Sequence, residues 1–174
     1  GELRAIKPRL IISAAVWSDP TTARLNLMQN WVNWAANKWV DYLTPMAYSN
    51  NDQTFTRLVT AQQAAVDDIA LLAPGIGLHT QKNEPTQVAR QVGIARKLLV
   101  SGQALFASSY YGEPQENALV AGPYARAAAV PVVARSARES REVEGIAVQA
   151  EVHDRHQVEL RFNYPLGEAE PRRY

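Results

Sequence analysis

The stretch Val40-Asp41-Tyr42-Leu43-Thr44-Pro45-Met46-Ala47-Tyr48-Ser49 decides how the rest of this chain is interpreted. Its apolar residues show no clean alternation with polar ones, which is typical of a strand covered on both faces in a parallel sheet. Pro45 cannot donate to a ladder of hydrogen bonds, so it is tolerated only at a bulge or near a strand end. The stretch therefore predicts a buried strand that leaves through an aromatic and polar exit loop.

The same unit recurs along the chain. Apolar runs at residues 10–17, 71–79 and 104–111 predict three more buried strands. Between the strands, apolar residues return at helical spacing, which predicts helices from Thr21 through the Trp31–Trp39 segment, over 55–70, and over 86–100 after Pro85. We expect Trp31, Trp34 and Trp39 to pack within or beneath the helices. The last helix is expected to bury Val88, Val92, Ala95, Leu98 and Leu99.

Four strands alternating with helix-sized connections predict right-handed parallel crossovers, and so either a doubly wound α/β sheet or a (β/α) barrel. No Gly-x-Gly-x-x-Gly motif follows a strand, and Gly75-Ile76-Gly77 lies inside one, so a dinucleotide fold is not indicated. Each strand instead ends in polar or aromatic side chains, which would meet at the carboxyl-terminal mouth of a barrel. We therefore predict the C-terminal portion of a (β/α)8 TIM-type barrel, about four β/α units, followed by a short β-rich segment.

Composition excludes several classes of protein. The chain has 174 residues, 47% of them hydrophobic and 20% charged, with a formal net charge of +1 and no cysteine. Disulfides and thiolate metal sites are excluded, and the charge gives no reason to expect nucleic acid as a partner. No apolar run approaches the roughly 20 residues that span a bilayer, and no signal peptide is visible. Residues 1–8 look like the end of a helix, which suggests a fragment of a longer polypeptide.

The segments Trp31-Val32-Asn33-Trp34 and Val40 to Tyr48 resemble the bacterial glycosyl hydrolase family-10-like domain, a (β/α) barrel of envelope-associated hydrolases. Lys7-Pro8 with the following strand, Pro74 to Leu78, and Gly122 to Pro131 are similar to further parts of that family. The likeness covers residues 1–131 and implies the last strands of the barrel, with the first half supplied by a preceding segment or another chain. It also implies an extracytoplasmic or cell-envelope location. The acidic pair associated with catalysis in that family would lie in the other half.

Six residues at strand ends are candidates for substrate binding. Flat aromatic faces match the C–H faces of pyranose rings, although large rings could equally fill the upper layer of a barrel. His79 is the best polar candidate, while a lone histidine is a poor metal ligand, so we predict no metal and no cofactor. The candidates are Trp17, Tyr48, Asn50, His79, Gln81 and Tyr110.

The acidic residues have simple structural interpretations. Asp19 precedes Pro20 and could be a turn or helix-cap residue, although it is also the one weak candidate for a general acid. Asp41 begins its strand and so belongs to the structural, amino-terminal end of the barrel. Asp67 and Asp68 fit a solvated helix face.

The composition and pattern of the sequence change after Pro131. Residues 135–144 alternate in charge and predict a linker or short exposed helix, and residues 168–174 predict a disordered tail. Two alternating runs, 145–152 and 157–164, flank His153-Asp154-Arg155-His156 and predict a hairpin within a partial β module at 132–174. A polar turn explains the two histidines more simply than a metal site does, because no fourth ligand is in view.

Together these features predict a carbohydrate-active protein, a glycoside hydrolase acting on a polysaccharide or cell-envelope glycan by the two-carboxylate mechanism. This chain would supply the aromatic and polar wall of the cleft. The alternative is a non-catalytic glycan-binding or structural envelope subunit, which the absence of a recognisable carboxylate pair favours for this polypeptide.

Overall fold

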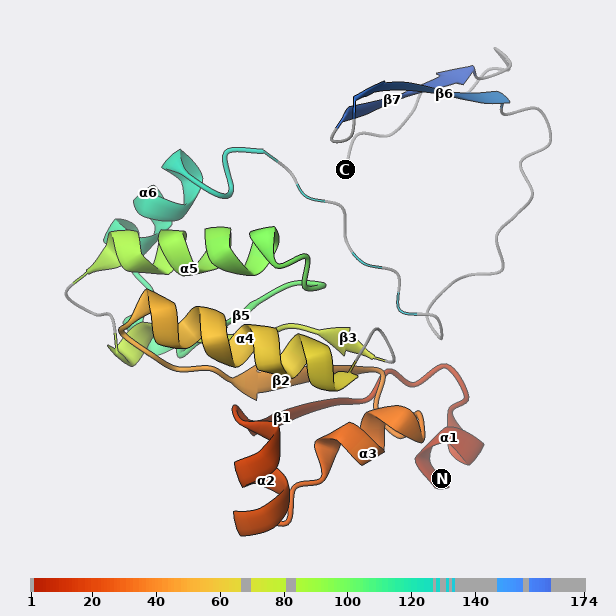
Figure 1. Ribbon diagram of the computed structural model, residues 1–174, viewed down its shortest axis with the longest axis vertical. Helices are drawn as coiled ribbons and strands as arrows, with labels where there is room; N and C mark the ends of the chain where they lie inside the picture. The colour runs from red at the N-terminus through yellow and green to blue at the C-terminus, as the bar shows by residue number, and fades with distance from the viewer. Residues whose placement is uncertain are drawn as a thin grey trace. The chain divides into compact units, whose positions relative to one another are not determined.

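The structure is a computed structural model that describes residues 2–66, 70–80, 84–126, 128, 131 and 133, and the two strands Ala147–Asp154 and Gln157–Asn163. Contacts within the chain divide it into two units, Gly1–Ala137 and Arg138–Tyr174. The first unit is mixed α/β and holds every described helix (Figure 1). In the second, the described residues form an antiparallel hairpin.

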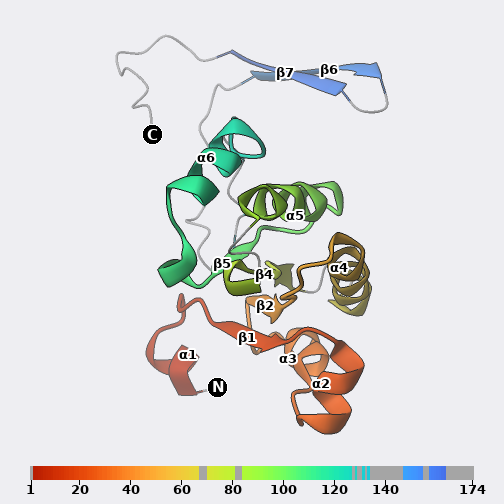
Figure 2. The same cartoon turned by 90° about the vertical axis from the view of Figure 1, so that its left-hand side faces the viewer.

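The strands of the first unit are parallel and short. β1 (Ser13–Trp17) pairs with β2 (Tyr42–Met46) over its whole length, and β2 pairs with β3 (Leu71–Leu72). A second sheet joins β4 (Gly75–Gly77) to β5 (Ala104–Phe106). Within both sheets, neighbouring strands follow one another in chain order (Figures 1 and 2). The prediction of parallel strands joined by helical crossovers is confirmed, although the described residues form no closed barrel.

The predicted run 71–79 is two strands rather than one. Pro74 has no N–H and separates β3 from β4, yet the chain bridges the gap because Ala73 N donates to the Leu43 carbonyl and Ala104 N donates to the Pro74 carbonyl. After β4 the chain turns at once into a 3₁₀ turn, η1 (Leu78–Thr80). The strand predicted over 104–111 likewise ends at Phe106, and η2 (Ser108–Tyr110) follows it.

One face of the first sheet is much more open than the sequence predicts. Alternate strand residues point to opposite faces. Val16 and Leu43 are buried and pack in one apolar cluster, whereas Ser13, Ala15 and Trp17 on the other face of β1 are exposed. The expectation that the β1 strand is buried on both faces is therefore wrong.

Two short helices cover the buried face of β1. α2 (Pro20–Asn26) contributes Ala23, and α3 (Trp31–Ala36) contributes Trp31 and Ala35, to the cluster around Val16 and Leu43. Trp31 is fully buried, as predicted. The helix ends three residues before Trp39, so Trp39 is not helical. Its side chain is 56% exposed, and the prediction that Trp39 packs within or beneath a helix is wrong.

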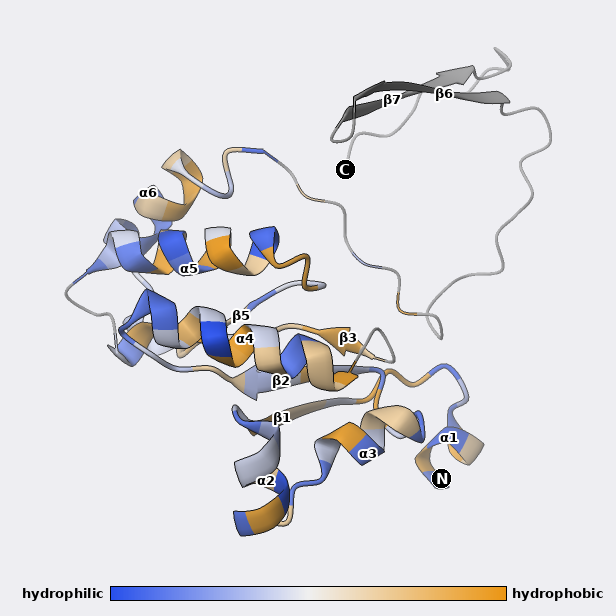
Figure 3. Cartoon of the chain, in the orientation of Figure 1, coloured by the Kyte–Doolittle hydropathy of each residue, from blue (hydrophilic) through white to orange (hydrophobic). Residues whose placement is uncertain are grey.

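Helices α4 (Asp52–Val66) and α5 (Pro85–Lys97) enclose the second apolar cluster. Both carry alternating hydrophilic and hydrophobic segments along the ribbon, as amphipathic helices do (Figure 3). Phe55 and Val59 of α4 pack with Val88 and Val92 of α5 around Ala47, Ile76, Leu78 and Leu119. Pro85 begins α5 as predicted. Leu99 is not buried: it lies beyond the helix end with a φ of 59° and is 84% exposed.

Two further helices complete the first unit. α1 (Glu2–Ile6) confirms the helix expected at the start of the chain. α6 (Glu113–Ala121) was not predicted, and it packs against α5 by burying Leu119 and Gln115. None of the described helices has the length and apolar character that crossing a bilayer requires.

The second unit confirms the predicted hairpin. β6 (Ala147–Asp154) and β7 (Gln157–Asn163) are antiparallel, with Val148 opposite Phe162 and Ala150 opposite Leu160. A register shift between Val152 and Asp154 marks an irregularity next to the turn. The predicted linker at 135–144 and tail at 168–174 lie outside the described residues.

Candidate functional site

Four rings meet at the carboxyl ends of β2, β4 and β5: Phe106 is the last residue of β5, and the other three follow the strands. Tyr48 and Phe106 stack with their centroids 5.4 Å apart and their planes 10° from parallel. His79 stands edge-on to both, 5.1 Å from Tyr48 and 6.0 Å from Phe106, and Tyr110 lies 6.2 Å from His79 at a tilt of 52°. We call Tyr48, His79, Phe106 and Tyr110 the aromatic cluster. Stacked and edge-to-face geometries at these distances are the favourable ones for aromatic pairs.

Two glycines of β4 make room for the cluster. A Cβ on Gly77 would lie 2.9 Å from Tyr48 Cβ and 3.0 Å from His79 Cε1, and a Cβ on Gly75 would lie 2.9 Å from Tyr48 Cε1. Any side chain at either position would therefore collide with the Tyr48 ring. The Gly-Ile-Gly spacing, which indicates no phosphate loop, instead lets Tyr48 lie directly on the backbone of β4.

The members of the cluster differ in exposure. Phe106 is 52% and Tyr110 46% exposed, whereas Tyr48 and His79 are half-buried. Burial raises the pKa of the Tyr48 phenol above its usual value. His79 Nδ1 is buried and has no hydrogen-bond partner among the described residues. The cluster therefore combines two exposed rings, Phe106 and Tyr110, with two half-buried rings, Tyr48 and His79.

Trp17 lies at the same edge of the sheet but outside the cluster. It ends β1 opposite Met46, and it is 43% exposed, without a ring contact to the four clustered rings. Its backbone N–H donates to Oε1 of Gln29, 2.9 Å away. Tyr42 N donates to the Ile12 carbonyl, so Ile12 directs its backbone N–H and C=O toward β2. Every second residue does the same, and the backbone groups of the residues between them, Trp17 included, point away from β2. The Gln29 side chain thus covers the last donor on the outer edge of β1.

Side chains of α5 hydrogen-bond to the loop between β2 and α4. Gln91 Nε2 donates to the Ser49 carbonyl at 2.9 Å, and Gln87 Nε2 donates to the Asn50 carbonyl at 2.6 Å. Both carboxamides also reach Oδ1 of Asp52, whose Oδ2 accepts from Arg90 Nε at 3.0 Å. We call Asp52, Gln87, Arg90 and Gln91 the α5 clamp. Asn50 is therefore fixed through its backbone, and its side chain lies on the surface.

Asp19 serves as a helix cap. Its Oδ1 accepts from Thr22 N at 2.7 Å, at the N-cap position of α2. This backbone hydrogen bond is the main reason that the pKa of Asp19 lies below its usual value. A general acid needs a raised pKa so that it still carries a proton near neutral pH, so the environment of Asp19 favours the structural role.

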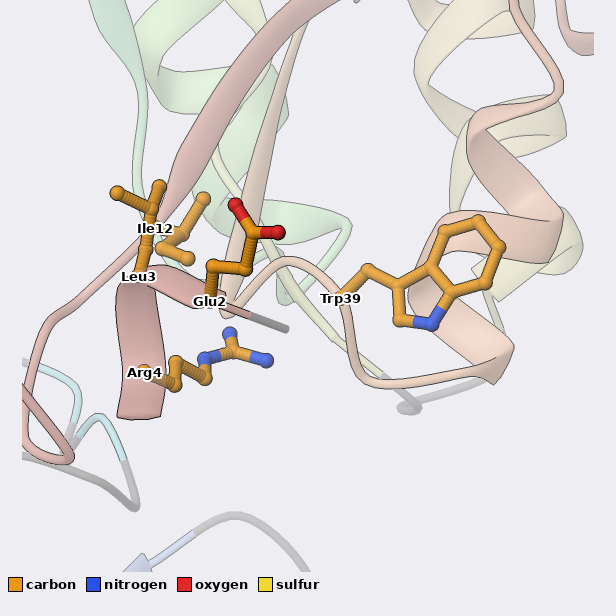
Figure 4. A pocket seen from close by; sticks show the side chains of 5 residues that line it. All are labelled: Glu2, Leu3, Arg4, Ile12 and Trp39. Carbon is orange, nitrogen blue, oxygen red and sulfur yellow. The ribbon is translucent and has the colours of Figure 1, made fainter. Parts of the chain in front are cut away.

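Asp41 lies at the opposite, amino-terminal end of the strands, as predicted. Its Oδ2 accepts from Ile12 N at 2.8 Å and pairs with Arg4 at 3.1 Å. The same Arg4 also donates to the Lys38 carbonyl. A pocket of about 490 Å³ opens here, and Figure 4 shows its lining residues, Glu2, Leu3, Arg4, Ile12 and Trp39. Arg4 already pairs with Asp41, and Glu2 is the other charged side chain among those five residues.

The structure thus brings together three of the six predicted binding residues, Tyr48, His79 and Tyr110. Trp17 and Asn50 lie at the same edge without joining them, and Gln81, like Asp67 and Asp68, lies outside the described residues. Within the described part of the chain, no group of three or more histidine, cysteine or acidic residues could hold a metal ion.

The sequence pattern does not single out Phe106, because this residue lies within an apolar run that extends to Tyr111. The available signal is Ser108-Ser109, two turn-favouring residues that can end a strand early.

No protein family model, curated protein or solved structure matches this chain.

Proposed function

We propose that the first unit binds carbohydrate at the carboxyl edge of its parallel strands, as the aromatic wall of a glycoside hydrolase-type cleft. The observation that carries the proposal is the aromatic cluster, in which rings from three strand ends meet and two of them stay exposed. Exposed aromatic faces are costly unless a partner covers them, and sugars cover them with their C–H faces while leaving their hydroxyl groups in water.

The position of the cluster supports the same reading. Catalytic and binding residues of α/β enzymes gather at the carboxyl ends of parallel strands, and residues at the amino ends serve stability. Here the rings lie at the carboxyl ends, and the Arg4–Asp41 ion pair lies at the amino ends. Chain-order pairing of parallel strands and the open face of β1 fit a segment of a (β/α) barrel. In that arrangement another chain, or a preceding segment of a longer polypeptide, would supply the remaining strands.

Binding is better supported than bond cleavage by this chain alone. Glycoside hydrolysis needs two carboxyl groups about 5–9.5 Å apart at the scissile bond. Of the aspartates the structure describes in the first unit, Asp19 caps a helix, Asp41 lies at the opposite edge, and Asp52 belongs to the α5 clamp. None of these three aspartates lies at the aromatic cluster as a free acid or base, so the proposal assigns binding rather than bond cleavage to this unit. An extracytoplasmic or envelope glycan is the substrate class that the proposal assigns.

Isothermal titration of the chain with soluble β-glucan, chitin oligosaccharides and peptidoglycan fragments tests the proposal. We expect saturable binding to at least one of these, with no release of reducing ends. Trp39→Ala is the matched control, since it removes an equally exposed ring at the other edge of the sheet and should leave binding unchanged. Absence of binding to all three glycans, or loss of binding in Trp39→Ala, would refute it.

A further inference from the structure

The Tyr48 ring is crowded by backbone and by a second ring. A Cβ on Gly75 or Gly77 would come within 2.9 Å of Tyr48, and Phe106 stacks on the Tyr48 ring with the two centroids 5.4 Å apart. The residue that the sequence singles out as a sugar platform is therefore half-buried and already in close contact with β4 and Phe106.

Phe106 is in the opposite situation. One face of its ring rests on Tyr48, the ring of His79 meets it edge-on at 88°, and 52% of its surface remains exposed. Tyr110 is similarly exposed and inclined by 52° to His79. Two exposed rings thus rest on a base formed by two half-buried ones.

We infer that Phe106, with Tyr110 beside it, is the sugar-stacking residue of this site, and that Tyr48 and His79 are positioning residues that hold it. This assignment rests on the proposed function and names the residue and the sugar class. Phe106 has no hydrogen-bonding group, so it contacts a sugar only through dispersion and C–H/π attraction, which depend on how flat the sugar face is. A pyranose with all-equatorial substituents, such as β-linked glucose, presents such a face.

A sugar with an axial hydroxyl, as in mannose, would lose flatness on one side. We expect the site to prefer glucose-type over mannose-type chains of the same linkage.

The test compares β-1,4-linked gluco- and manno-oligosaccharides of equal length by titration calorimetry. Phe106→Ala should weaken gluco-oligosaccharide binding at least tenfold, which corresponds to about 1.4 kcal/mol. Phe106→Tyr, which keeps the ring, should restore binding to within about threefold, and Tyr48→Phe should stay within about threefold as well, because it keeps the supporting ring. Thermal unfolding of each variant shows whether it is folded at the temperature of the titration.

The outcomes separate the two proposals. If the unmodified chain binds none of the glycans, the proposed function fails. If it binds but Phe106→Ala binds equally well, or if Phe106→Tyr binds as weakly as Phe106→Ala, the proposed function survives and the stacking role of Phe106 is wrong. Equal affinity for gluco- and manno-oligosaccharides would overturn the sugar class.

Discussion

The two ends of the parallel strands are built from different chemistry. At the carboxyl ends, rings contact rings and two of them stay open to solvent. At the amino ends, Asp41 accepts from Ile12 N, which links the start of β2 to the start of β1, and also pairs with Arg4 of α1; the Arg4 and Asp41 side chains are only 16% and 7% exposed. The two ends therefore have different roles: one holds the strands together and the other presents a surface. Substitutions at the amino ends should change stability, and those at the carboxyl ends should change binding.

The largest expected effect is at the amino end. Asp41→Ala leaves the Arg4 guanidinium unpaired and removes the acceptor of Ile12 N, so we expect a loss of about 3 kcal/mol in unfolding free energy. Urea titration measures it, with Glu84→Ala as the control: Glu84 pairs with Arg90 at 3.8 Å in an exposed ion pair and should cost under about 0.5 kcal/mol. Glycan affinity of the folded Asp41→Ala protein should not change. A loss of affinity with unchanged stability would reverse the assignment of the two ends.

The next effect is at the carboxyl end. Gly77→Ala places a Cβ 2.9 Å from Tyr48 and 3.0 Å from His79, so we expect about 1–3 kcal/mol of destabilisation and a loss of glycan binding as the cluster shifts. Gly93→Ala in α5 is the matched control: its Cβ would meet nothing within 4 Å, so the better helix propensity of alanine should stabilise the protein by about 0.5–1 kcal/mol. Thermal unfolding and calorimetric titration give both quantities. Normal binding by Gly77→Ala would show that the fit of Tyr48 on β4 does not matter.

The α5 clamp should have a smaller effect. Gln91→Met keeps the volume of this fully buried side chain but removes the hydrogen bonds to the Ser49 carbonyl and to Asp52, which should cost about 1–2 kcal/mol. Hydrogen exchange should become faster in the loop after β2 and stay unchanged in β1. Unchanged exchange in that loop would mean that Gln87 and Arg90 hold it without Gln91.

The smallest effect concerns the cap of α2. Asp19→Ala should cost about 1 kcal/mol, and Asp19→Asn much less, because asparagine also caps helices well. The pKa of Asp19 is lowered in the folded state, so the carboxylate contributes its stability above the unfolded value near 3.9 and loses it as the pH falls through the folded value. The gap in stability between the wild-type protein and Asp19→Ala should therefore be full at neutral pH and narrow in acid. A gap that does not change with pH would contradict a charged cap.

Local patterns in the sequence predict much of this fold. Alternation of apolar runs with helical spacing gives the parallel strand–helix order, and Asp19 and Pro85 mark helix starts because capping and the missing proline N–H act within a few residues. The hairpin of β6 and β7 follows from two alternating runs around a polar turn.

The parts that the sequence did not predict depend on contacts between distant residues. A glutamine in a helix looks solvent-facing, but Gln91 is buried because a carbonyl 42 residues away accepts its hydrogen bond. The need for glycine at positions 75 and 77 is set mainly by Tyr48, which follows β2 and is distant in the sequence. The site depends on where β5 ends, and an apolar run cannot show that Phe106 is its last residue.

The hydrogen bond from Trp17 N of β1 to the Gln29 side chain bears on how readily the protein aggregates at high concentration. An exposed edge strand is a template on which strands of other molecules can grow, and proteins usually blunt such edges with charges, prolines or bulges. Here a single carboxamide from the segment after α2 occupies the Trp17 N–H and shortens the row of donors that a foreign strand could use. A neutral side chain thus limits sheet growth at Trp17, the last residue of β1.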